Sequence, residues 1–394
     1  MGSASGTPRW SAAAWLMLLL AAPLHAGVTT EQSSSILFFP KVMSDSTGVQ
    51  TGGAPVDTII QISNTSNSLV FAHCFYVNAA PNNPNQPPSV LNPPQWQEID
   101  FDITLTKAQP THWVVSAGRR FDTSDNTPCN LAPGYCENAG FDPGGLIPPV
   151  SDPFTGELKC IEETPDGYPL NGNHLKGEAT LVTPNGDASE YNAIGVLGLN
   201  TDQNYNDGDN NLVLGGPVSP SECPNCPEYN GCPETVIMDH FAENASDPAI
   251  DTLGQGPSQV VTELTVVPCS EDFENQSPTP VTIQFVMTNE FEQPFSTSTT
   301  VTCWGNFRLN SIGAGNFGRI FDVSFLGTRF AQTRMQAVAT DAAGNPASGF
   351  VAVAEEFHRA PTNVPTPIVS RAAVNLHGEG DRVNADVIVL PQVQ

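Results

Sequence analysis

The sequence is poor in basic residues. It has 14 Lys and Arg against 41 Asp and Glu, and its formal net charge is −27 at pH 7. The 131 residues between Lys176 and Arg308 contain no Lys or Arg at all. A surface with this excess of negative charge repels phosphate groups, which argues against nucleic acid and anionic membrane surfaces as partners. Divalent cations and basic protein surfaces are still compatible with it, and an acidic surface that merely keeps an exported protein soluble is the simplest alternative.

The sequence also lacks the short motifs that mark the common enzyme classes. It contains no nucleophile elbow, phosphate loop, dinucleotide fingerprint or zinc-protease helix. The nearest approach to a hydrolytic set is Asp239 and His240 with Ser246 nearby. An enzyme is therefore not indicated, and a hydrolase on a β scaffold is kept as the second alternative.

Long apolar runs are absent after the first 26 residues. Arg9 precedes the apolar stretch 12–22, and Leu24-His25-Ala26 fits a small-residue cleavage site, so residues 1–26 are predicted to be a secretory signal peptide. The apolar stretch is too short for a membrane-spanning helix, although an N-terminal membrane anchor is the alternative. We expect a secreted, periplasmic or cell-surface protein with no integral membrane segment in its mature chain.

Few segments have the spacing of an amphipathic helix. The 36 Pro and 33 Gly leave little room for long helices, and residues 233–244 are the one stretch where we predict a helix. Short runs of β-branched and aromatic residues, separated by Pro, Gly, Asn and Asp, are typical of β-strands joined by turns. The expected strands form two sets: 35–40, 57–63, 69–77, 100–107, 111–117, 155–163, 176–183 and 191–199, then 262–268, 280–287, 297–304, 319–326, 329–337, 349–356, 371–377 and 384–390.

The two sets of expected strands repeat each other. Residues 101–105 (FDITL) match residues 321–325 (FDVSF), and the other matches fall in the same order on both sides. These other matches include 36–40 with 264–268, 58–62 with 281–285, 74–75 with 303–304, and 155–163 with 348–356. Each match is weak by itself, but their shared order predicts a tandem duplication, with a first domain at 34–200 and a second at 262–392.

The order of several segments carries a family resemblance. A strand that ends in Pro40 is followed by residues 57–64 (DTIIQISN), residues 105–111 (LTKAQPT) and Thr155-Gly156. This order resembles the immunoglobulin-like β-sandwich modules that are repeated in bacterial exported and surface proteins. The resemblance implies an all-β fold of two tandem immunoglobulin-like antiparallel β-sandwiches, related by internal duplication, and it implies no activity. Members of this broad group usually serve adhesion, spacing or presentation.

The first copy has two long loops, at 78–99 and 117–153, which are rich in Pro, Gly and Asn. If successive strands alternate in direction, both loops leave the same end of the first sandwich. Ligand sites on such scaffolds usually lie on loops, so we predict a binding face there that contains Trp96, Arg119 and Arg120. An exposed Trp96 could stack on a sugar ring, whereas loops without any function are the alternative.

Residues 201–261 match neither copy and are predicted to be an acidic, cysteine-containing linker. Asp202, Asn204, Asn206, Asp207 and Asp209 surround Gly208 within it. Because Ca²⁺ binds six to eight oxygen ligands, these side chains are a candidate calcium site. Their spacing does not match an EF-hand loop, and an ordinary turn rich in Asn and Asp is the alternative.

All nine cysteines follow the predicted signal peptide, and export favours disulfides. The predicted pairs are Cys74–Cys160, Cys129–Cys136 and Cys269–Cys303. Cys223, Cys226 and Cys232 are left over, and with His240 they could bind Zn²⁺ in a tetrahedral site. One disulfide and one free thiol is the alternative for these three cysteines.

Two further groups of polar residues are interpreted as structural. His73 and His112 lie on expected strands, and the second copy has no histidine at the matching positions, so we expect packed or hydrogen-bonded side chains. Glu162 and Glu163 are a carboxylate pair, but adjacent strand residues face opposite sides of a sheet. The two carboxylates therefore cannot share one site.

Together these observations predict a non-catalytic structural, adhesive or interaction protein of the cell surface or periplasm. Its expected partner is a protein or glycan surface. The first alternative is a calcium-dependent carbohydrate-binding module, and calcium is the one cofactor that the sequence suggests.

Overall fold

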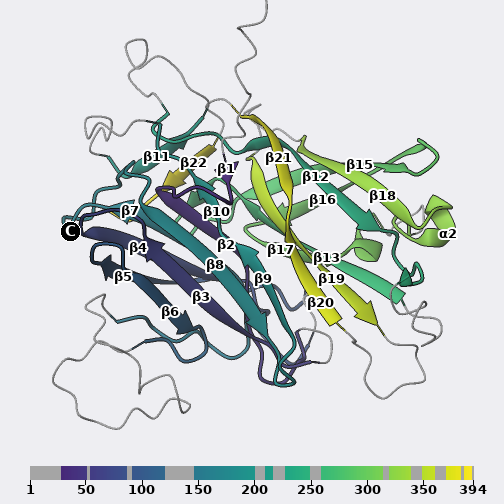
Figure 1. The fold of residues 1–394 in the computed structure, drawn as a ribbon, viewed down its shortest axis with the longest axis horizontal. Coiled ribbons are helices and arrows are strands. Elements are labelled where there is room, and N and C mark those ends of the chain that lie inside the picture. Colours follow the sequence, from purple (N-terminus) through teal and green to yellow (C-terminus); the bar gives the residue numbers. More distant parts are fainter. Residues whose placement is uncertain are drawn as a thin grey trace, which may run out of the picture.

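The described part of the chain consists mainly of β-strands and the turns between them (Figure 1). The computed structural model describes residues 28–50, 54–86, 91–119, 146–199, 209–215, 227–248, 259–313, 319–338, 348–359, 370–382 and 386–392. The prediction of an all-β protein is confirmed. Within the described residues, no helix is long and apolar enough to cross a membrane.

The first half of the molecule, residues 28–199, contains two sheets. Sheet I has the order β1-β10-β2-β7-β4-β5, with strands at Val28–Thr29, Ile194–Val196, Ile36–Ser44, Phe154–Glu163, Val70–Asn78 and Gln97–Leu105. Sheet II has the order β6-β3-β8-β9, with strands at Pro110–Val114, Asp57–Asn64, Leu175–Val182 and Ala188–Asn192. Burial in β3 alternates strictly along the strand, whereas every residue of β2 and β7 is buried. Strands β2 and β7 therefore have both faces covered.

The second half, residues 233–381, contains two more sheets. Sheet IV has the order β16-β15-β18-β12-β21, with strands at Pro294–Thr302, Pro280–Asn289, Phe330–Ala337, Pro233–Phe241 and His377–Asp381. Sheet V has the order β17-β13-β19-β20, with strands at Gly305–Arg308, Gln259–Pro268, Phe350–Arg359 and Ser370–Asn375. The small sheet III joins β11 (Asn211–Leu214), β22 (Asp386–Val389) and β14 (Glu271–Asp272).

The prediction of two tandem immunoglobulin-like sandwiches is wrong. The five small sheets are arranged as a five-bladed β-propeller, although each sheet takes its strands from separate parts of the chain. Sheet III contains a strand from the predicted linker, because β11 lies within residues 201–261 and pairs with β22 near the C-terminus. Strand β12 also comes from the linker and lies between β18 and β21.

The hydrophobic core also contains side chains from both sides of the predicted linker. One buried cluster contains most of the apolar side chains of the first half. The same cluster includes these side chains from later in the chain: Leu212, Leu214, Val267, Cys269, Phe273, Val351, Val353, Ile388 and Leu390. A second cluster lies within the second half and includes Met238, Phe285, Phe321 and Met335.

The sequence repeat corresponds to only part of the structure. Strands β2 and β7 pair in the same register as β13 and β19, so that Leu37 faces Cys160 and Thr265 faces Val353 at aligned positions. The best sequence match does not hold, because residues 101–105 lie in β5 and residues 323–326 form the short helix α2 (Val323–Leu326). The side chain of Asp322 caps α2 by accepting a hydrogen bond from Ser324 N, and Gly327 ends it at φ 71°.

The helix predicted at 233–244 is a strand instead. Residues Pro233–Phe241 form β12, where Val236, Met238 and His240 are buried and Asp239 is exposed. This alternation has the period of two that a half-buried strand shows. The β-branched residues at 235–237 fit a strand better than a helix.

Two disulfides lie within the described residues. Cys74 and Cys160 join β4 and β7 inside sheet I. Cys269 pairs with Cys232 and not with Cys303, so the predicted Cys269–Cys303 pair is wrong. Cys303 is a buried free thiol. The predicted Cys129–Cys136 pair lies outside the described residues.

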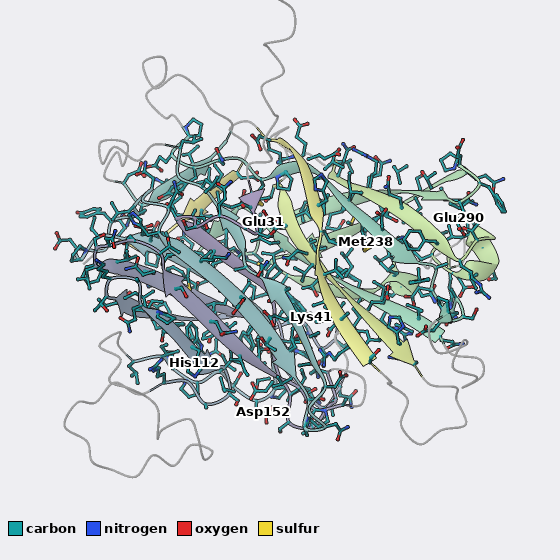
Figure 2. The ribbon with its side chains drawn as sticks, viewed as in Figure 1. Glu31, Lys41, His112, Asp152, Met238 and Glu290 are labelled. Carbon is teal, nitrogen blue, oxygen red and sulfur yellow. A yellow bond between two sulfur atoms is a disulfide. The ribbon has the colours of Figure 1, made fainter. Side chains whose placement is uncertain are left out.

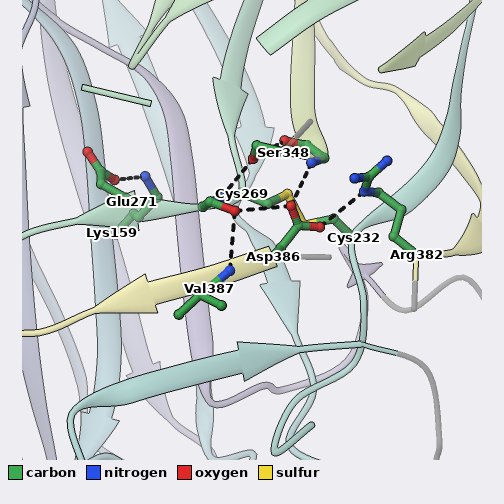
Figure 3. Close-up of a disulfide and its surroundings, with 10 residues drawn as sticks. Lys159, Cys232, Cys269, Glu271, Ser348, Arg382, Asp386 and Val387 are labelled. Carbon is green, nitrogen blue, oxygen red and sulfur yellow. Dashed lines mark hydrogen bonds and ion pairs between the residues drawn. A yellow bond between two sulfur atoms is a disulfide. The ribbon is translucent and has the colours of Figure 1, made fainter. Parts of the chain in front are cut away.

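The Cys232–Cys269 disulfide lies beside the buried carboxylate of Asp386, which contacts three segments of the chain (Figure 3). Asp386 accepts hydrogen bonds from Gly349 N at 2.6 Å and from Ser270 Oγ at 3.1 Å, and Arg382 Nε donates to it at 3.2 Å. Asp386 is fully buried. Because a buried carboxylate is stable only when it is hydrogen-bonded or paired, these contacts fix the start of β22 against sheet V.

Glu243, which follows β12, predicts a pH dependence of stability. It is buried, Oε1 accepts a hydrogen bond from Thr262 N at 2.5 Å, and burial raises its pKa to about 7. Its pKa in the folded chain therefore exceeds the ordinary value of 4.5, so the stability it contributes at low pH is lost as pH rises from 4.5 through about 7. We expect the free energy of unfolding of Glu243→Gln, measured with urea, to rise relative to that of the wild type as the pH is raised from 4.5 to 7.5.

Glu274 is exposed, so Glu274→Gln is the matched control. Its free energy of unfolding should equal that of the wild type at pH 4.5 and at pH 7.5. If the Glu243→Gln and wild-type curves stay parallel across this pH range, the assignment of a buried, protonated Glu243 is wrong.

Candidate functional site

The two halves meet at a buried lysine. Lys41 lies on β2 (Figure 2). Its Nζ is 2.8 Å from Glu263 Oε2 and 2.7 Å from Glu355 Oε2, on β13 and β19 of the second half. The Lys41 and Glu355 side chains are 2% and 1% exposed. Arg371 on β20 also pairs with Glu355, and Ser189 on β9 donates a hydrogen bond to the same carboxylate at 2.6 Å. We call these five side chains the junction cluster.

The charges of the junction cluster support one another. Burial alone would lower the pKa of Lys41, but the carboxylates of Glu263 and Glu355 outweigh burial and raise it. Burial alone would raise the pKa of Glu355, but Lys41 and Arg371 lower it. Both groups therefore stay charged at neutral pH, and each half supplies the counter-charge that the other half needs.

Other contacts extend the junction on either side of this cluster. Lys159 on β7 is fully buried, forms ion pairs with Glu157 and with Glu271 of β14, and lies 5.1 Å from the ring centre of Phe38. Strands β9 and β20 are joined by a reciprocal pair, because Asn192 N donates to Asn375 Oδ1 at 2.9 Å and Asn375 Nδ2 donates to Asn192 O at 2.8 Å.

A cavity of about 510 Å³ lies at the same junction, which we call the junction cavity. Its wall includes residues of strands β1 and β10 of the first half and of β12, β19 and β21 of the second half. Its apolar lining includes Val28, Ile194, Leu197, Val236, Val351 and Leu376. Its polar lining includes Glu31, Gln32, Asn230 and His377.

The polar groups lie at the open side of the junction cavity. Glu31 and Gln32 are exposed, and the His377 side chain is 72% exposed with its Nε2 3.9 Å from Glu379 Oε1. Val351 and Val236 are buried. The cavity therefore has an apolar interior and a rim with hydrogen-bonding groups and negative charge.

The loop residues predicted to bind a ligand have structural roles where they are described. Trp96 is partly buried, has φ 51°, and packs against the core of the first half, so it is not an exposed platform for a sugar ring. Arg119 Nη1 donates to Thr111 Oγ1 at 2.6 Å and to His112 O at 3.1 Å, which ties it to β6. Arg120 lies outside the described residues.

Most residues of the predicted calcium site lie outside the described residues, whereas part of the predicted zinc site is described. Asp202, Asn204, Asn206 and Asp207 of the calcium prediction lie outside the described residues, and Asp209 accepts a hydrogen bond from Asn211 N at 2.7 Å. The zinc prediction is wrong, because the Cys232 thiol is used in a disulfide. About 23 Å of extended strand also separates Cys232 from His240. The other two zinc ligands, Cys223 and Cys226, are not among the described residues.

His240 instead has a buried structural position. Its Nε2 is 2.8 Å from Thr333 Oγ1 and its Nδ1 is 2.8 Å from Phe241 O. Burial lowers the pKa of His240 to about 4, so the ring is neutral at pH 7. This arrangement is that of a packed, hydrogen-bonded histidine, and it does not suit a general base.

The junction cavity and a second group of polar residues on sheet I were not among the predicted sites. His73, which was interpreted as structural, lies near Asp100, Asp102 and Glu163. A signal was present in the sequence, because Glu98, Asp100 and Asp102 alternate with apolar residues along β5 and therefore share one face. The junction cavity has no such signal, since its wall comes from segments far apart in the chain.

Known proteins resemble this chain only weakly. No protein-family model matches the chain, and no curated protein matches it. A solved structure of the Thermotoga maritima protein 1070 is 6% identical, covers 41% of this chain and 93% of its own, and has a TM-score of 0.22. A candidate secreted protein from Parabacteroides distasonis is 10% identical, covers 89% of this chain and 90% of its own, and has a TM-score of 0.19. Similarity at this level supports no conclusion about fold or function.

The junction cluster predicts a large stability effect. Replacing Lys41 with Met leaves the Glu263 and Glu355 carboxylates without their shared buried partner. We expect Lys41→Met to lower the free energy of unfolding by about 3–5 kcal/mol, measured by urea unfolding at pH 7.

Lys107→Met is the matched control, because Lys107 is exposed, and it should change the free energy of unfolding by less than about 0.5 kcal/mol. Equal effects of the two substitutions would contradict the role assigned to Lys41.

Proposed function

We propose that this chain is an exported, non-catalytic binding protein that takes a small ligand, or the tip of a partner molecule, into the junction cavity. The observation that supports the proposal is the cavity itself, at the meeting point of two halves that are held together by buried ion pairs. Its volume of about 510 Å³ falls within the range of roughly 300–1,000 Å³ that is usual for ligand pockets.

The lining favours a ligand with an apolar body and a polar, cationic end. Val28, Leu197 and Leu376 offer apolar surface inside the cavity, and Glu31 places a carboxylate at its rim. The formal charge of −27 on the whole chain favours cations over anions in the approach to this rim.

Binding is a better account of the cavity than catalysis. Thr29, Thr30, Glu31 and His377 are the lining residues whose side chains could act as a nucleophile, acid or base. The His377 side chain is 72% exposed, and its described ion-pair neighbour is Glu379 and not a hydroxyl group of the lining. An exposed histidine without a positioned partner is a poor general base.

Export is supported by the cysteine chemistry. Disulfides persist in oxidising compartments outside the cytosol, and the described residues contain two of them. A cell-surface or periplasmic location for this binding protein fits both the disulfides and the predicted signal peptide.

The proposal is tested with the fluorescent amine dansylcadaverine, which combines an apolar ring system with a primary ammonium group. We expect saturable binding to the mature chain. Thr30→Trp should abolish it, because a large side chain at the cavity wall fills the space. Glu31→Gln should weaken binding roughly two- to fivefold, because the loss of one exposed ion pair usually changes a binding constant by about this factor.

Asn67→Trp is the control, because Asn67 is exposed in a bend of the first half and is no part of the cavity lining. It should bind the probe as the wild type does. Unchanged binding by Thr30→Trp, or no binding by the wild type, would contradict this proposal.

A further inference from the structure

We propose that His73, Asp102 and Glu163 form a binding site for one divalent transition-metal cation on sheet I. This site involves neither the junction cavity nor either of the metal sites predicted from the sequence. The proposal therefore stands or falls independently of the proposed function.

The three side chains come from adjacent strands and share one face. His73 on β4 is directly opposite Asp102 on β5. Glu163 on β7 is opposite Phe71, which is two residues before His73 and therefore points to the same face. Three hydrogen-bonded strands of one sheet form a rigid support, so the donor groups need little reorganisation to bind an ion.

The donor atoms are already close to metal-binding distances. One ligand atom from each of His73, Asp102 and Glu163 lies within 4.8 Å of the other two. His73 Nδ1 is 3.7 Å from Glu163 Oε2. Two ligands at about 2.1 Å from a tetrahedral metal ion are roughly 3.4 Å apart, so only a small movement is needed.

Glu163 provides the independent indication of a missing cation. Its side chain is 8% exposed, and within the described part of the chain Oε2 has no hydrogen-bond partner. A buried carboxylate oxygen without a partner is costly and calls for an explanation. Burial, then the nearby charge of Asp102 and a side-chain hydrogen bond with Asp102, raise the pKa of Glu163 to about 8, so a cation bound here would displace a proton. A bound cation would remove both the unpaired oxygen and the repulsion between the two carboxylates.

Asp100 has the position of a residue that orients the histidine. Its Oδ2 is 3.2 Å from His73 Nε2. When His73 donates its Nε2 proton to this carboxylate, the lone pair of Nδ1 faces Glu163. Histidines that bind metals usually donate their other ring N–H to a carboxylate in this way. The ring is also held by Phe75, whose centroid is 4.2 Å away.

The donor set selects the class of metal. One imidazole nitrogen with two carboxylate oxygens suits Zn²⁺ or Mn²⁺, whereas Ca²⁺ prefers six to eight oxygen ligands. The Asp102 side chain is 75% exposed, so solvent can reach the site and complete the coordination shell.

The test is metal binding to the mature, folded chain after treatment with a chelator and its removal. ZnCl₂, MnCl₂ and CaCl₂ are titrated separately, with native mass spectrometry for stoichiometry and calorimetry for affinity. We expect Glu163→Gln to bind one Zn²⁺ fewer than the wild type, with an affinity loss at this site of at least about 100-fold. Glu163→Gln keeps the size of the side chain, so the fold should be retained, which circular dichroism checks.

Asp100→Asn tests the positioning role separately. It should retain the stoichiometry and lower the Zn²⁺ affinity by about 10-fold, since it removes an orienting carboxylate and no ligand. Glu178→Gln and His112→Ala are the matched controls on sheet II, and both should bind metal as the wild type does. Other metal-binding groups in the chain do not disturb the comparison, because they are the same in every variant.

Two results would overturn the proposal. The first is unchanged Zn²⁺ and Mn²⁺ stoichiometry and affinity in both Glu163→Gln and His73→Ala. The second is a site that is lost in these variants but prefers Ca²⁺ over Zn²⁺, which would contradict the nitrogen-containing donor set.

Discussion

The buried pairing of Lys41 with Glu263 and Glu355 is the constraint on which the rest of this structure depends. A charged lysine that is 2% exposed cannot stay in the interior without counter-charges, and both of its carboxylates come from the other half of the chain. Arg371 of the same half and Ser189 of the first half complete the surroundings of Glu355, so the buried charge of Lys41 is compensated only when the two halves are together. The two halves are therefore halves of one folding unit and not independent modules.

This constraint also explains where the candidate sites lie. The ion pair between Lys41 and Glu263 holds strands β2 and β13 together. At the same junction, β1 and β21 leave space between them, and that space is part of the junction cavity. The face of sheet I that carries Lys159 also carries a second group of charged side chains. There, His73 and three carboxyl side chains of Asp100, Asp102 and Glu163 gather at strand positions that a purely structural role would not require. The structure thus separates a stabilising cluster of charges from two places that are open to ligands.

The sequence predicted what depends on short-range patterns. Alternating residues such as those of 57–64 predicted strands, and the apolar and turn-rich composition predicted an all-β protein. It failed where pairing between distant segments decides the outcome. Cys269 pairs with Cys232 beside Asp386, which joins distant segments, and residues 323–326 form a helix that Asp322 and Gly327 cap. His73 was interpreted as structural because one strand does not show that β5 and β7 place carboxylates beside it.

Differential scanning calorimetry of the mature, disulfide-intact chain tests the central claim most directly. If buried ion pairs and a shared core join the halves, the protein unfolds in a single transition whose calorimetric and van't Hoff enthalpies agree. Two separate transitions, or a calorimetric enthalpy near twice the van't Hoff value, would show that the halves unfold independently and would contradict the account.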